Sequence, residues 1–210
     1  MRTTPLLVVL LAAACSSSSG GTAAGTPAPS AASPFAAATS PSPAVAPQSP
    51  VPAEHNPPGD IPDNLAFVPY RNLAGRYSFT HPEGWAERTR GSDVLFTDKL
   101  NGVEALLGSA SSPPTVAAAK RDDVPRLRSS QPAFELRSVA TVTLPSGRGV
   151  RIVYRRNSPP DAVTGRQYRD EVERYEIVAH GSEVILELFG PVGADNVDAY
   201  RTMSQSLRFS

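Results

Sequence analysis

The second half of the chain alternates apolar and polar residues in short runs that Pro, Gly and Asn interrupt. This period of two is typical of strands that bury one face and leave the other in water. The runs predict strands over residues 76–79, 94–96, 103–107, 136–144, 149–155, 167–179 and 183–189. Turn sequences such as Asn101-Gly102 and His180-Gly181 separate neighbouring runs. We therefore expect the last four runs, over 136–189, to form an antiparallel meander.

Two segments have helical spacing instead. Pro113-Pro114 fits a helix start, because the first turn does not use the donor that proline lacks. A helix is predicted over 115–124, and Pro125 should kink or end it. Near the C-terminus, Asp195 is expected to cap a helix whose apolar residues recur every three or four positions. This helix should cover the apolar face of the sheet, which predicts an α+β domain with an antiparallel sheet flanked by helices.

The first fifteen residues show the order of a secretory signal. Arg2 precedes the apolar run Leu6–Leu11, and Ala12–Ala14 leads into Cys15, the only cysteine of the chain. The run is too short for a membrane span, which needs about 20 apolar residues. The last four residues resemble the bacterial lipobox, although Ala12 stands where most lipoboxes have Leu. We expect a lipoprotein signal peptide over 1–14 and an acylated (palmitate) Cys15 at the extracytoplasmic face of the membrane; the alternative is an ordinary secretory signal near a free thiol.

Residues 16–58 are mostly Ala, Pro, Ser and Thr, and Glu54 is the only Asp, Glu, Lys or Arg among them. Such a segment has too few large apolar side chains to offset the entropy of ordering its backbone, so it is predicted to be a disordered tether. Apolar residues return from 60 onward, and we interpret 60–72 as a lead-in that packs on the domain edge. The expected organisation is a signal peptide over 1–14, lipidated Cys15 and tether over 15–72, and one domain over 73–210.

Several phrases of the domain resemble the Mog1/PsbP-like fold, in particular the actinobacterial lipoproteins that carry it behind a proline-rich tether. The similar residues are Tyr77-Ser78-Phe79 followed by Pro82-Glu83-Gly84-Trp85, the strands 166–175 and 184–188, and the segment 193–200 that leads into the final helix. The resemblance implies an antiparallel sheet flanked by helices and a non-catalytic role. Members of this fold serve as accessory subunits, regulators of partner proteins, or envelope proteins that bind lipids or glycolipids.

The composition carries few of the patterns that metal or nucleic-acid binding needs. The 20 Lys and Arg residues balance the 20 Asp and Glu residues, which disfavours nucleic acid as a partner. The histidines, His55, His81 and His180, do not have the spacing of metal ligands, and Cys15 is assigned to the anchor. We therefore expect no metal and no cofactor.

Catalytic patterns are equally weak. No Gly-x-Ser-x-Gly elbow is present, and Ser92 and Ser182 follow glycines in expected turns. The acidic residues of 171–176 lie on one predicted strand and the arginines of 151–156 on another. We interpret them as cross-strand charge pairs.

These observations favour a membrane-anchored, non-catalytic binding or accessory protein for an envelope protein, lipid or glycolipid. The alternative is a cell-envelope hydrolase that uses His81 or His180 as a base. An apolar cavity between sheet and helix would favour binding, whereas a polar cleft with a perturbed acid or histidine would favour catalysis. The sequence leaves the oligomeric state and the identity of the partner open.

Overall fold

The computed structural model describes residues 46–54, 59–110 and 112–210, all within one compact unit that spans 42–210. Its strands form two antiparallel sheets, a three-stranded sheet in the order β1-β2-β10 and a seven-stranded sheet in the order β3-β4-β5-β9-β8-β7-β6. The strands are β1 (Phe67–Asn72), β2 (Tyr77–Pro82), β3 (Ala86–Arg90), β4 (Asp93–Asp98), β5 (Asn101–Gly108), β6 (Glu135–Leu144), β7 (Gly147–Asn157), β8 (Arg169–Ala179), β9 (Ser182–Pro191) and β10 (Arg208–Phe209). The predicted α+β class with an antiparallel sheet is confirmed.

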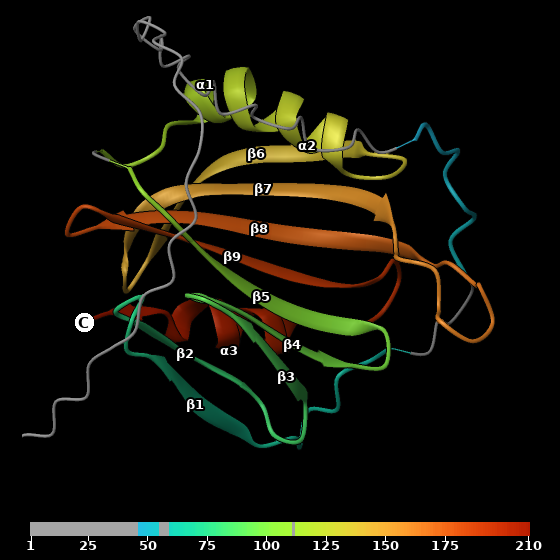
Figure 1. Ribbon diagram of the computed structural model, residues 1–210, viewed down its shortest axis with the longest axis horizontal. Helices are drawn as coiled ribbons and strands as arrows, with labels where there is room; N and C mark the ends of the chain where they lie inside the picture. Colours follow the sequence, from blue (N-terminus) through green and yellow to red (C-terminus); the bar gives the residue numbers. More distant parts are fainter. Residues whose placement is uncertain (1–45, 55–58, 111) are drawn as a thin grey trace, which may run out of the picture. The chain divides into compact units, whose positions relative to one another are not determined.

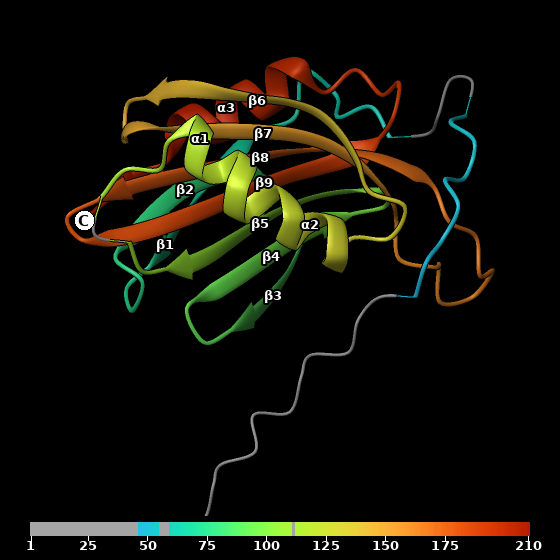
Figure 2. The ribbon, with the colours of Figure 1, turned by 90° about the horizontal axis from the view of Figure 1, so that it is seen from above.

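The seven-stranded sheet is covered on both faces. A helical segment made of α1 (Val116–Ala118), η1 (Ala119–Asp123) and α2 (Val124–Ser130) lies on one face, and α3 (Val197–Ser206) lies with the small sheet on the other (Figures 1 and 2). The core under α3 includes Tyr77, Phe79, Phe96, Tyr175, Ile177, Leu186, Leu188, Met203 and Leu207. The core under α1–α2 consists of Ala119, Val124, Leu127, Val150, Ile152, Tyr154 and Val172.

The helix that begins after Pro113-Pro114 is longer than expected. Thr115 caps it, because its Oγ1 accepts a hydrogen bond from the Ala118 N–H at 3.1 Å. Pro125 does not end the helix, which continues to Ser130. A π-helical turn precedes the proline, and the Val124 N–H bonds to the Ala119 carbonyl five residues back. Pro125 therefore enters α2 in its first turn, where a missing N–H is tolerated.

Two local predictions are wrong. Asp195 does not cap α3; Asn196 precedes the first helical residue, and the Asp195 N–H bonds to the Asp60 carboxylate instead. Asn101 and Gly102 do not form the tight turn either, because both belong to β5 and the positive φ angle falls on Lys99. At both positions the backbone of residues 59–61 supplies a hydrogen-bond partner. The side chain of Asn101 donates to the Gly59 carbonyl at 2.7 Å. The side chain of Asn196 accepts from the Ile61 N–H at 2.8 Å.

The ordered structure begins before residue 73, where we expected the domain to start. β1 lies within the range assigned to the tether, and it pairs with β2 over its whole length, from Phe67 opposite Pro82 to Asn72 opposite Tyr77. Ile61, which is 5% exposed, belongs to the core under α3. The lead-in 60–72 is therefore part of the domain. The expected signal peptide and Cys15 lie outside the described residues.

None of the helices in the described part of the chain has the length and apolar character that crossing a membrane requires.

Candidate functional site

Charged side chains interrupt the row of apolar positions on the face of the large sheet that carries α1–α2. The helical segment covers the apolar positions of β6 and β7 on this face. Beyond it, the register places Arg174 of β8 opposite Glu187 of β9, and Glu187 opposite Glu104 of β5. Charged residues therefore run across the middle of the sheet.

Arg174 is the centre of a buried charge cluster. Its Nε donates to Glu176 at 2.7 Å and its Nη1 donates to Glu187 at 2.7 Å. The three side chains are 12%, 3% and 5% exposed, and the Tyr154 hydroxyl donates to the same Glu187 oxygen at 3.3 Å. Burial raises the pKa of Glu176, and Arg174 opposes that rise. The cluster is a fixed polar floor, since each charge is held by a partner at hydrogen-bond distance.

Two hollows open on this face of the sheet, and the buried cluster forms part of the lining of the first. The first hollow, about 580 Å³, lies between α2 and strands β5, β8 and β9, and its lining includes Asp123, Arg126, Arg174, Glu183 and Glu187. The second hollow, about 440 Å³, lies beside it and is lined in part by Arg88, Leu95, Lys99, Arg166, Tyr168, Asp170 and Phe189. Both are lined by Glu104 and Arg156. We call the two together the polar groove.

Asp170 and Arg156 form an incomplete ion pair in the polar groove. Asp170 is 2% exposed, and its Oδ2 lies 3.9 Å from the Arg156 Nε, which is too far for a hydrogen bond. That Nε is buried and has no hydrogen-bond partner in the described part of the chain. Arg156 is held instead by its Nη1, which donates to Gln131 at 2.9 Å, and by the Phe189 ring 5.0 Å away. The pair thus leaves one donor of Arg156 unused beside the Asp170 carboxyl, and both side chains line the second hollow.

Several carboxyl groups of the groove, among them Asp170 and Glu104, hold their protons more tightly than usual. Burial raises the pKa of Asp170 to about 7, although Arg156 and Arg169 oppose the shift. Burial also raises the pKa of Glu104, and the Glu187 carboxylate opposite adds to the effect. Near neutral pH, Asp170 can therefore either accept a hydrogen bond or donate one.

The histidines proposed as bases lie away from the groove. His81 is buried in β2, where its ring stacks on Phe96 and its Nδ1 lies 2.9 Å from the Pro82 carbonyl. His180 is exposed at the tip of the β8–β9 hairpin, and its φ of 53° together with the 76° of Gly181 shows that it serves the turn. Of the residues that the structure describes, no histidine lines either hollow.

The expected cross-strand pairs are present in part. Arg155 pairs with Glu171 at 2.9 Å and Arg151 pairs with Glu173, both on the face away from the groove. Glu176 does not pair with an arginine of β7; it belongs to the buried cluster of Arg174. Over residues 46–54, 59–110 and 112–210, no three Asp, Glu, His or Cys side chains are grouped to hold a metal ion.

The groove was not predicted from the sequence, although its signal is present in the alternation. In β8 the positions facing α1–α2 read Val172, Arg174, Glu176, and in β9 they read Ile185, Glu187, Phe189. Charged residues interrupt an otherwise apolar stripe. Only the position of the α1–α2 segment in the structure shows that the charged residues lie beyond the edge of this segment, where the first hollow forms.

Comparison with known proteins yields matches only among solved structures. No family model and no curated protein matches the chain. Cyanobacterial PsbP from Synechocystis is similar at 15% identity and a TM-score of 0.48 over 73% of this chain and 99% of that chain. The Ran-binding protein Mog1p from Saccharomyces cerevisiae is similar at 9% identity and 0.46, over 70% and 96%.

LpqN, involved in cell envelope biogenesis of Mycobacterium tuberculosis, is similar at 12% identity and a TM-score of 0.39, over 70% of this chain and 92% of that chain. The chain spans about half, 48%, of a Bacteroides thetaiotaomicron protein that also matches. PsbP and Mog1p give their names to the fold group that the sequence resembles. These similarities describe the arrangement of strands and helices, and what each neighbour binds is a property of that neighbour.

Proposed function

We propose that this protein is a non-catalytic binding protein, anchored through a lipidated Cys15 at the extracytoplasmic face of the membrane, whose polar groove holds an envelope molecule. The pattern of residues 1–15 supports the anchor. The domain then extends over 60–210, residues 46–54 lie against it, and the Pro-rich segment between Cys15 and residue 46 is the proposed tether. The partner is a polar headgroup of an envelope lipid or glycolipid, and an envelope protein is the alternative partner.

The observation that carries the proposal is the Asp170–Arg156 pair in the second hollow. Both side chains line this hollow, so a ligand hydroxyl can accept from the Arg156 guanidinium and donate to Asp170. The hollows, of about 580 and 440 Å³, have the size of small-molecule sites, which favours a headgroup over a flat protein surface. The ion pairs of Arg174 fix the lining of the adjoining first hollow before a ligand arrives.

The groove can be tested by mass spectrometry of lipids that co-purify with the full-length protein from its own membranes. Arg156→Gln should lose the co-purified molecule, because it removes the guanidinium that faces the hollow. Arg155→Gln is the matched control, since Arg155 is the preceding residue of β7 and pairs with Glu171 on the opposite face. Equal recovery from both variants would remove the groove as the site. Crosslinks to an envelope protein that are lost only in the Arg156 variant would favour the protein partner.

The anchor is tested separately. Cys15→Ser should abolish acylation and release the protein from the membrane fraction, and the mass of the mature N-terminus in the wild type should include the acyl chains. An unmodified wild-type N-terminus would contradict the anchor and leave the groove untouched.

One observation favours the second candidate, an envelope hydrolase. Charged residues are part of the lining of the second hollow, and burial places the pKa of one of them, Asp170, at about 7, as a general acid requires. Asp170→Asn should retain activity in a deletion-complementation assay if the protein only binds, because the amide keeps both donor and acceptor. Complete loss of complementation with retained ligand recovery would favour hydrolysis.

A further inference from the structure

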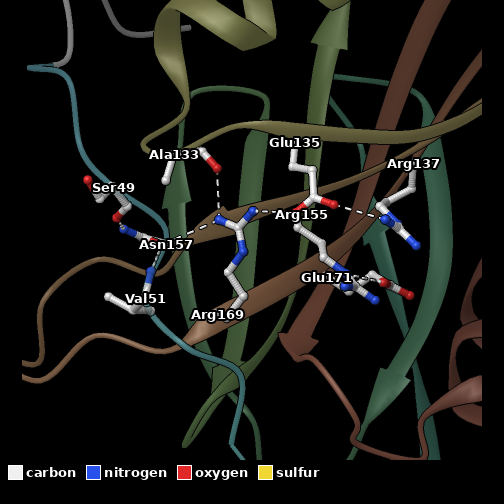
Figure 3. Close-up of polar contacts among 9 residues, drawn as sticks. All are labelled: Ser49, Val51, Ala133, Glu135, Arg137, Arg155, Asn157, Arg169 and Glu171. Carbon is white, nitrogen blue, oxygen red and sulfur yellow. Dashed lines mark hydrogen bonds and ion pairs between the residues drawn. The ribbon is translucent and has the colours of Figure 1, made fainter.

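Residues 46–54, which we call the strap, lie against the domain at the end of β7. Asn157, the last residue of β7, binds the strap through both ends of its side-chain amide (Figure 3). Its Oδ1 accepts from the Val51 N–H at 3.0 Å, and its Nδ2 donates to the Ser49 carbonyl at 2.8 Å. The amide pairs with the strap backbone as a neighbouring strand would, so the contact does not depend on the side chains of Ser49 or Val51.

The Asn157 amide is held in place from the other side. The Arg169 guanidinium donates to the Ala133 carbonyl at 2.8 Å and to Glu135 at 3.0 Å, and it reaches the Asn157 Oδ1 at 3.4 Å (Figure 3). Asn157 and Arg169 are 1% and 5% exposed. The strap therefore docks on a rigid, buried anchor point of the large sheet.

The strap also contacts the loop that walls the second hollow. This loop, residues 158–168, joins β7 to β8 and contributes Ser158, Asp161, Arg166 and Tyr168 to the lining. Arg166 forms an ion pair with Glu54 of the strap, and the Gln167 amide donates to Gln48 at 3.4 Å. Within the loop, the Ser158 N–H bonds to the Tyr168 carbonyl and the Asp161 N–H to the Arg166 carbonyl, each at 2.8 Å.

We propose that the strap is a mechanical link between the N-terminal chain and the second hollow. A pull along the chain from its N-terminal side acts first on the Asn157 contact and then on Arg166. Release of the strap frees one wall of the hollow while β7, β8 and β9 stay paired in the sheet. The state of the strap thereby controls the order of this wall, and the wall's contact with a ligand rests on the proposed function. The link concerns this chain alone and does not depend on which molecule the groove holds.

The test removes a single N–H from the strap. Val51→Pro deletes the donor to Asn157, and the strap sequence already contains Pro47, Pro50 and Pro52, so an extended proline is compatible with it. Val51→Ala is the matched control, because it shortens the same side chain and keeps the N–H. The readout is backbone hydrogen exchange of residues 158–168 in the full-length protein without ligand, with the exchange of β8 as the measure of intact folding.

Loss of one backbone hydrogen bond should speed exchange in the 158–168 loop by roughly 2- to 12-fold in the proline variant and leave it near wild type in the alanine variant. Glu54→Gln should raise exchange around Arg166 in the same direction. Faster exchange confined to 46–54, with an unchanged loop, would overturn the link. So would equal effects of proline and alanine at residue 51.

Discussion

Replacement of Asp170 by asparagine tests the electrostatics of the groove most directly. Asp170 is 2% exposed, and burial raises its pKa from an ordinary 3.8 to about 7. A difference of about three units between the pKa of Asp170 in the unfolded chain and in the folded chain corresponds to about 4 kcal/mol in the free energy of unfolding. The raised pKa already includes the opposing effect of Arg156.

The sign follows from where the proton is held. Below pH 4 the carboxyl is protonated in both states and the fold keeps the full stability of this group. Between pH 4 and 7 the unfolded chain releases the proton while the folded chain retains it, so the stability of the wild type falls as pH rises and levels off above pH 7. The amide that replaces the carboxyl in Asp170→Asn does not titrate. The free energy of unfolding of the variant relative to wild type should therefore rise by about 2 to 4 kcal/mol between pH 4 and pH 8.

Urea unfolding at several pH values, followed by the fluorescence of Trp85, measures this difference, because Trp85 is the only tryptophan and is 7% exposed in the core. Asp122→Asn is the control, since Asp122 is exposed on the helical segment and pairs only with its neighbour Arg121. A difference between Asp170→Asn and wild type that stays constant with pH would refute the assignment of Asp170 as a buried, proton-retaining acid.

Further predictions concern the stability of the sheet, and urea unfolding at pH 7 measures all of them. Arg174→Met should cost about 3–5 kcal/mol, because it leaves two buried carboxylates unpaired, and adding Glu176→Gln and Glu187→Gln should recover part of the loss; no recovery would contradict the ion-pair explanation. Gly149→Ala should cost about 1–3 kcal/mol, because its Cβ would lie 2.1 Å from the Glu176 carbonyl oxygen, and a neutral effect would be inconsistent with that approach. Leu127→Ala should cost about 2–5 kcal/mol by opening a cavity under α2, and a loss below about 1 kcal/mol would mean that the helix packs loosely.

Alternation predicted most of the sheet because burial of one strand face leaves a period of two in the sequence. The runs 136–144 and 183–189 became β6 and β9 with shifts of at most a few residues at their ends. The helix boundaries were less accurate. Pro125 looks like a terminator from the sequence, but the π-helical turn before it moves its missing N–H into a first turn. A rule based on neighbouring residues cannot predict this, because the packing of Val124 and Leu127 on the sheet stabilises the helix beyond Pro125.

Residues 59–61 show the same limit at the N-terminal side. They directly follow the Pro-rich segment, and the sequence predicted only that residues from 60 onward pack on the domain edge. The Asn101 and Asn196 side chains, far apart in the chain, bind the Gly59 carbonyl and the Ile61 N–H. Asn196 is consequently unavailable as a conventional helix cap.

The sequence by itself determined the α+β class and the antiparallel order of hairpins, and it is the whole basis of the proposed anchor at Cys15, because these depend on residues close together in the chain. Only the tertiary structure decided where the polar groove lies and which charges meet in it. Glu104, Arg156, Asp170, Arg174 and Glu187 come from four strands that are brought side by side by pairing across the sheet. Their partners, burial and pKa values arise from that pairing and from the edge of the α1–α2 segment. No pattern of neighbouring residues in the sequence determines the strand pairing or the position of that edge.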